Sequence, residues 1–165
     1  MPRIVSLLLS LLLMLPIALP DGVRAQGKDI AFGTINADRD QPIEVSADNL
    51  AVDQDAGVAT YSGNVLTRQG GTRLAAPRIR VVFPADGGKI ERIEAAGGVT
   101  LVSGADAAES RQAVYSVATG MIDMRGAVLL VQGDDVITGE HLVVNTRAGT
   151  ARISGRVRTI LQPRN

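Results

Sequence analysis

Apolar and polar residues alternate along most of the chain after residue 41, in short stretches separated by glycine and aspartate. Ile43 and Val45 alternate with polar neighbours, which is the period of a half-buried strand. No segment shows a long 3.6-residue period. We expect strands at 43–47, 50–53, 58–68, 73–83, 89–94, 99–103, 113–117, 121–124, 128–132, 136–138, 142–145, 151–154 and 157–161.

A glycine followed two residues later by valine returns four times, beginning at Gly63, Gly97, Gly126 and Gly155, at intervals of 34, 29 and 29 residues. A fixed period of this size indicates a stack of similar supersecondary units, each too small to bury its own apolar face. A glycine inside a strand usually marks a bulge or a bend. We therefore predict that the strands bend at this position and fold the sheet over into a roll.

Tight turns are predicted between the strands, most clearly at 84–88, 53–57 and 133–135, where Pro, Gly and Asp gather. Short strands joined by tight turns pair with their sequence neighbours in antiparallel fashion. The pattern therefore predicts an all-β protein, built as a sandwich, roll or barrel.

The first 25 residues have the layout of a secretory signal peptide. Arg3 is followed by 16 almost wholly apolar residues, 4–19, fewer than the roughly 20 of a spanning helix. We expect cleavage between Ala25 and Gln26, and a retained membrane anchor is the alternative. Residues 26–40 are predicted to form a flexible leader, 41–161 a single domain and 162–165 a polar tail.

Composition excludes several classes of function. Without Arg3, Arg24 and Asp21 the chain carries one more acidic than basic residue, so no basic field is available for nucleic acid. Aromatic residues make up 2% of the chain, too few for platforms on which bases or sugar rings stack. Cysteine is absent, so the domain depends on packing or assembly rather than on disulfides.

No catalytic, metal-binding or cofactor-binding residues are assigned. His141 is the single histidine and has no evident partners, so we expect a structural role. The segment beginning at Asp53 resembles a calcium loop faintly, but its twelfth position is Asn64 and not glutamate. Asp134 and Asp135 are adjacent and follow a glycine, which favours a turn. A glycan-modifying enzyme on a β-roll stays an alternative, and paired carboxylates in a cleft would support it.

Three pieces of sequence resemble the OstA-like family: the run 41–50, the phrase 61–65 with its Ser-Gly-Asn-Val, and Gln69-Gly70 before a basic and apolar strand. The similarity extends over 41–161. Pro77 departs from it, since the family tends to have an acidic residue at that position. Because proline cannot donate to a strand ladder, we expect an edge or a bulge there.

The resemblance implies an antiparallel β-jellyroll of two facing sheets, open at both ends. Within the family, the chain is most similar to the periplasmic proteins that transport lipopolysaccharide. The resemblance thus implies that the protein forms a bridge between the inner and outer membranes. The bridge would be built by self-association and by contact with OstA-like domains of the inner- and outer-membrane transport proteins. The alternatives are an OstA-like domain of one of those partner proteins and a structural or adhesive β-roll without lipid.

A lipid interior needs only aliphatic side chains. Burying one acyl CH₂ contributes about 0.8 kcal/mol, so a chain of a dozen carbons gains on the order of 10 kcal/mol. An alternating aliphatic face is equally typical of a dry core, and the sequence does not separate the two. The candidate inward residues are Ile43, Val45, Val65, Ile79, Val81, Phe83, Val99, Leu101, Val114, Met124, Leu130, Leu142 and Val144.

The first strands (43–52) and the last (151–161) are expected to be the open edges of the sheet. Unpaired strand edges present rows of backbone donors and acceptors that pair with another chain. We therefore predict oligomers whose size depends on concentration.

Overall fold

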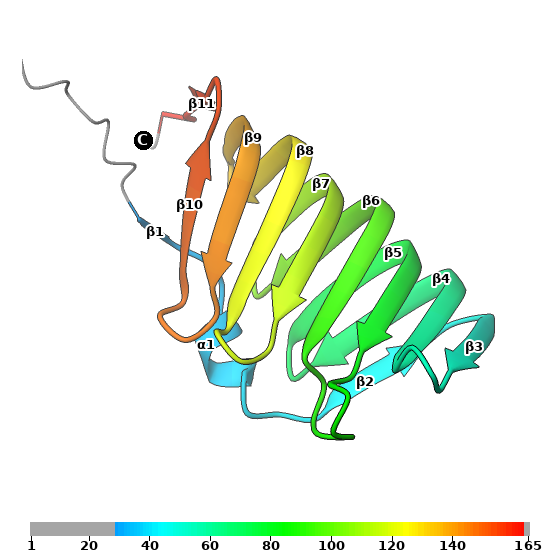
Figure 1. Ribbon diagram of the computed structural model, residues 1–165. Coiled ribbons are helices and arrows are strands. Elements are labelled where there is room, and N and C mark those ends of the chain that lie inside the picture. The colour runs from blue at the N-terminus through cyan, green and yellow to red at the C-terminus, as the bar shows by residue number, and fades with distance from the viewer. Residues whose placement is uncertain (1–28, 164–165) are drawn as a thin grey trace, which may run out of the picture.

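The computed structural model describes residues 29–163. Within that range the chain forms one short helix and eleven strands (Figure 1). The elements are β1 (Ile30–Ala31), α1 (Ile35–Asp38), β2 (Ile43–Ser46), β3 (Asn49–Asp53), β4 (Val58–Gln69), β5 (Thr72–Val82), β6 (Arg92–Ser103), β7 (Asp106–Ser116), β8 (Met121–Gln132), β9 (Asp135–Asn145), β10 (Thr150–Ser154) and β11 (Arg158–Ile160).

All strands belong to one antiparallel sheet, in the order β1-β10-β9-β8-β7-β6-β5-β4-β2. β3 pairs with the first half of β4 and β2 with its second half. At the other end β10 pairs with the second half of β9 and β11 with its first half. The sheet is not closed. Its edge strands are those expected from the sequence, with β2 and β3 at one end and β10 and β11 at the other, where β1 covers two residues of β10.

Each long strand is bent near its middle, and the bends lie in register across the sheet. The hydrogen-bonded register shifts at Gly63-Asn64 in β4, Gly97-Gly98 in β6 and Gly126-Ala127 in β8. Both residues of each pair have positive φ, as do Gly155-Arg156 between β10 and β11. Glycine adopts such angles most readily, and it is the first residue of all four pairs, so the repeated glycine is confirmed as a residue at which the sheet folds over.

The bends divide the sheet into two facing layers. The first layer holds β3, β10 and the halves of β4 to β9 that pair with them, and the second holds β2, β11 and the other halves. Figure 1 shows the bends along the top of the molecule and the ends of both layers at the bottom. We call this lower side, where hairpin turns of both layers lie, the seam.

Pro77 lies at the bend of β5, where the register with β6 shifts between Ala75 and Arg78. Its ring faces the glycine pair of β6, since a Cβ added to Gly97 would lie 3.3 Å from Pro77 Cγ. β5 is a central strand, so of the two expectations the bulge is confirmed and the edge is wrong. The missing N–H falls where the ladder is already interrupted.

The expectation of a flexible leader is wrong for residues 29–40. This segment forms β1 and α1, and it buries Phe32 and Ile35 completely or nearly so, at 0% and 3% exposure. α1 lies across the seam, beneath the two layers (Figure 1). Phe32 lies between β1 and α1, and its backbone N–H donates a hydrogen bond to the Gly149 carbonyl at 2.9 Å.

The expected signal peptide and its cleavage point at Ala25 and Gln26 lie outside the described residues, as do the last two residues of the polar tail. In the described range no helix has the length and apolar character needed to cross a membrane.

Candidate functional site

The space between the two layers is lined almost wholly by aliphatic side chains. Of the thirteen residues expected there, nine are buried and two, Ile43 and Val45, are half-buried and pack against the same cluster. The nine buried residues are Val65, Ile79, Val81, Val99, Leu101, Met124, Leu130, Leu142 and Val144.

Phe83 and Val114 do not face inward, and their prediction as interior residues is wrong. Val114 is 39% exposed, because the bend in β7 places Ala113 and Tyr115 on the inner face instead. It pairs with Glu94 and Asp123 on the outer face. Phe83, 38% exposed, follows the last residue of β5.

Sequence reasoning missed two kinds of interior residue. Ile93, Ile122 and Val128 are buried on the same face as their predicted neighbours, and the alternation within their strands would have found them. The other kind is small: the interior contains Ala59, Ala76, Ala95, Ala108, Ala113 and Ala151.

The interior is nearly filled in this conformation. Its seam end holds a cavity of about 40 Å³, lined by residues that include Leu74, Leu101 and Ile122. That is room for about one water, whereas an apolar cavity of roughly 150 Å³ is needed for benzene. Thr67 Oγ1 is buried near this end with no hydrogen-bond partner among the described residues. A ligand larger than benzene can therefore enter only if the layers separate.

The layers are joined differently at their two sides. At the bends the strands are continuous, so the layers are covalently linked there. At the seam the N-terminal segment, residues 29–41, connects them, and we call it the strap. It pairs with β10 of the first layer through β1, and it runs directly into β2 of the second layer. Hydrogen bonds from Gly33 N to Asp106 Oδ2 (2.8 Å), from Thr34 N to Ser103 Oγ (3.1 Å) and from Thr72 Oγ1 to Asp38 Oδ2 (2.7 Å) also tie it to the second layer.

Comparison with known proteins identifies the family to which the chain belongs. Residues 44–150 match the model of the family described as LptA/(LptD N-terminal domain) LPS transport protein. The chain belongs to this family. It is also 31% identical, over 86% of its length and 82% of the other, to an uncharacterized protein of Rhizobium meliloti.

Two named relatives fall in the same family. The chain is 28% identical to the lipopolysaccharide export system protein LptA of Escherichia coli K12, over 78% of this chain and 75% of that protein. The crystal structure of LptH, the LptA-homologous periplasmic component of the lipopolysaccharide transport device of Pseudomonas aeruginosa, superposes with a TM-score of 0.68 at 22% identity. The match covers 76% of this chain and 99% of that chain, and it shows that the two share the open β-jellyroll fold.

Several ion pairs lie on the outer face of the sheet. Glu94 accepts hydrogen bonds from Arg80 Nη1 at 2.7 Å and from Arg92 Nε at 2.8 Å, and its carboxylate raises the pKa of Arg92. Nothing in this network faces the space between the layers.

A second outer-face pair centres on Asp123. Arg125 Nε lies 2.6 Å from Asp123 Oδ1 and lowers the pKa of this carboxyl, with a smaller contribution from His141. His141 Nε2 lies 2.9 Å from Asp123 Oδ2, so the histidine has a structural partner.

The loops considered for metal binding have turn geometry. Asp53 Oδ1 accepts a hydrogen bond from Ala56 N at 3.0 Å and so caps the β3–β4 turn. In the part of the chain that the structure describes, no three His, Cys, Asp or Glu side chains are grouped as metal ligands would be. The family is one of transport proteins and not a class of enzymes.

Proposed function

We propose that this protein carries lipopolysaccharide across the periplasm, with the acyl chains held between the two layers of the jellyroll. The observation that carries the proposal is the interior itself: two continuous aliphatic faces that stay open at both ends of the sheet and that, among residues 29–163, meet without an ion pair between them. The eleven inward residues predicted from the sequence, together with Ile93, Ile122 and Val128, form the proposed lining.

Acyl chains replace the contacts that the layers make with each other. A dozen buried CH₂ groups contribute on the order of 10 kcal/mol. The polar contacts of the strap contribute about 0.5–1.5 kcal/mol each. We infer that the seam opens between the strap and the first layer, because the bends are continuous strands, whereas β1 joins the strap to β10 through two residue pairs. The bends then act as hinges.

The two ends of the sheet are proposed as assembly surfaces. Large apolar side chains are exposed at both, with Leu50 and Val52 at 56% and 62% on β3, and Ile160 and Leu161 at 47% and 69% at or beside β11. Such a pair of edges suits head-to-tail pairing with a second copy, or with related jellyrolls of the inner- and outer-membrane transport proteins. Joined ends would make the interior continuous from one subunit to the next.

The proposed location is the periplasm. The expected signal peptide directs export, and the Pseudomonas aeruginosa relative is described as a periplasmic component of the transport device. Absence of cysteine fits an oxidising compartment, where no thiol is then left to be oxidised.

The experiment is purification of the full chain from the periplasm of a lipopolysaccharide-producing cell, followed by mass spectrometry of the bound lipid. We expect lipopolysaccharide to co-purify. Protein that arrives free of lipid, and that stays free after incubation with saturating lipopolysaccharide, would leave the structural β-roll as the better account.

A further inference from the structure

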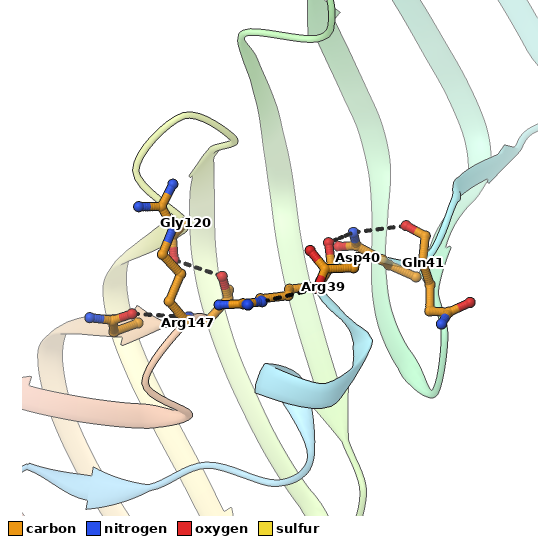
Figure 2. Close-up of polar contacts among 8 residues, drawn as sticks. Arg39, Asp40, Gln41, Gly120 and Arg147 are labelled. Atoms are coloured by element: carbon orange, nitrogen blue, oxygen red, sulfur yellow. Dashed lines mark hydrogen bonds and ion pairs between the residues drawn. The ribbon is translucent and has the colours of Figure 1, made fainter.

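A polar cleft opens at the seam beside the apolar interior. It has a volume of about 490 Å³ and lies between the end of α1 and the turns that join β7 to β8 and β9 to β10. Arg39 and Arg147 line it from its two sides. Figure 2 shows Arg39 at the end of α1 and Arg147 on the β9–β10 turn facing the same space.

The cleft and the interior share part of their walls. Gln69, Tyr115 and Thr146 line both the polar cleft and the small apolar cavity at the seam end of the interior. A single molecule with a polar head and an apolar tail could therefore occupy both spaces at once, with its head at the arginines.

Arg147 is positioned by its surroundings. Asn145 Oδ1 accepts hydrogen bonds from Arg147 N and Ala148 N, both at 3.0 Å, which fixes the turn. The guanidinium donates to the Ala118 carbonyl. Gly120 leaves room for the side chain, because an added Cβ would lie 3.0 Å from Arg147 Cγ. One donor is used in this way, and guanidinium has five.

Arg39 is held through its backbone while its head group remains accessible. Gln69 Nε2 donates to the carbonyls of Arg39 at 2.7 Å and Gln41 at 3.1 Å, as Figure 2 shows for the labelled residues. The side chain is 45% exposed and pairs with Asp40, 83% exposed, at 3.3 Å. An exposed pair of this kind is weak, so another anion can displace Asp40.

We propose that Arg39 and Arg147 bind a phosphate group on the head of the amphiphile whose acyl chains occupy the interior. The inference rests on the proposed function, and it names the part of the lipid that the cleft recognises. Guanidinium groups bind phosphate through paired, charge-assisted hydrogen bonds. Two arginines beside an apolar opening thus select a phosphorylated lipid over a neutral one.

The test is a binding titration of the full chain with lipopolysaccharide and with the same lipid after phosphatase treatment. Arg39→Ala and Arg147→Ala should each weaken binding of the phosphorylated lipid about tenfold, as expected for the loss of one charge-assisted hydrogen-bonding group. Binding of the dephosphorylated lipid should not change. Asp40→Asn should strengthen binding of the phosphorylated form, because it removes the competing carboxylate.

Arg111→Ala is the matched control, since it removes the same charge at the bends, on the side away from the seam. Melting curves check that each variant is folded. If both cleft variants bind the phosphorylated lipid as the unchanged protein does, the cleft is not the headgroup site, while the proposed function stands. If the unchanged protein binds neither lipid, the proposed function itself fails.

Inorganic phosphate alone distinguishes a lipid headgroup from a free anion. We expect no saturable binding of phosphate at millimolar concentration. Saturable binding that depends on both arginines and matches the affinity for the lipid would overturn the assignment to a lipid headgroup.

Discussion

At the scale of single residues, the fold depends on pairs of positions with left-handed backbone. Gly63-Asn64 has φ of 77° and 47°, and the pairs in β6 and β8 and the pair between β10 and β11 repeat the conformation. The second residue of a pair tolerates a side chain, as Asn64 and Ala127 show. The first is glycine in all four cases, and at Gly63 there is also no space, since an added Cβ would lie 2.5 Å from Asp48 Oδ2.

Gly63→Ala should therefore destabilise the protein by about 1–3 kcal/mol through backbone strain and the clash with Asp48. The measurement is urea denaturation. Gly71→Ala is the control, because Gly71 has ordinary φ and an added Cβ would make only van der Waals contact, 3.5 Å from Asp38 Oδ2. Equal free energies of unfolding for the two variants would show that the bend does not require glycine.

The ion pair at Asp123 predicts a dependence of stability on pH. Its pKa is lowered in the folded state, so the stabilising contribution is present above the unfolded value of about 3.9 and is lost as pH falls through the folded value. Asp123→Asn should cost about 0.2–1 kcal/mol at pH 7, a small amount because Asp123 and Arg125 are 34% and 59% exposed.

The difference between Asp123→Asn and the unchanged protein should shrink as the pH falls below about 3.9, and it should disappear below the folded pKa of Asp123, as followed by denaturation at a series of pH values. Asp55→Asn, which removes an exposed turn carboxylate, is the comparison. A cost for Asp123→Asn that stays constant down to pH 3 would assign the effect to packing rather than to charge.

At the scale of elements, the bends and edges were predictable from the sequence, and the strap was not. The bends depend on local backbone sterics, which a glycine repeat reveals directly. The inner face of β7 was misjudged at Val114 because the alternation changes phase between Ser110 and Ala113, at the bend. β1 and α1 are short, and the partners of β1 in β10 lie about 120 residues away, so the local sequence pattern gives little indication of them.

Phe32→Ala tests the strap as an element of the fold. Truncating a completely buried phenylalanine should lower the free energy of unfolding by about 3–5 kcal/mol. The same substitution in a flexible leader would leave it almost unchanged. Ile35→Val, which removes one buried methylene, should cost about 0.5–1.5 kcal/mol and keeps the test informative if the larger change unfolds the protein.

The stability of both strap variants is measured from their denaturation midpoints. Ile160→Ala is the control, because the Ile160 side chain is 47% exposed. If Phe32→Ala and Ile35→Val leave the denaturation midpoint unchanged, the strap is detached from the core in solution.

At the scale of the whole molecule, the roll has two unlike surfaces. Its flanks carry charged pairs such as Arg80–Glu94, and its two ends carry exposed aliphatic side chains. The sequence identified the end strands as edges, because they are first and last in a series of neighbouring hairpins. It did not identify the seam cleft, whose walls come from elements far apart in the chain.

Leu50→Lys combined with Val52→Lys should weaken self-association by placing two charges on the edge of β3. Sedimentation velocity over a range of concentrations is the measurement. Val114→Lys is the control, as it also replaces an exposed valine, but in the middle of the outer face. If the double substitution leaves the dependence of oligomer size on concentration unchanged, as the control is expected to do, the β3 end is not an assembly surface.

The most direct measurement is photo-crosslinking to lipopolysaccharide from neighbouring positions on opposite faces of β7. Tyr115 faces the interior and Val114 the outside, and an aromatic crosslinking residue replaces Tyr115 with little change of shape. We predict that lipopolysaccharide crosslinks at 115, and likewise at the buried Leu101, but not at 114. Crosslinks at 114 equal to those at 115, or none at 115 and 101, would contradict lipid binding between the layers.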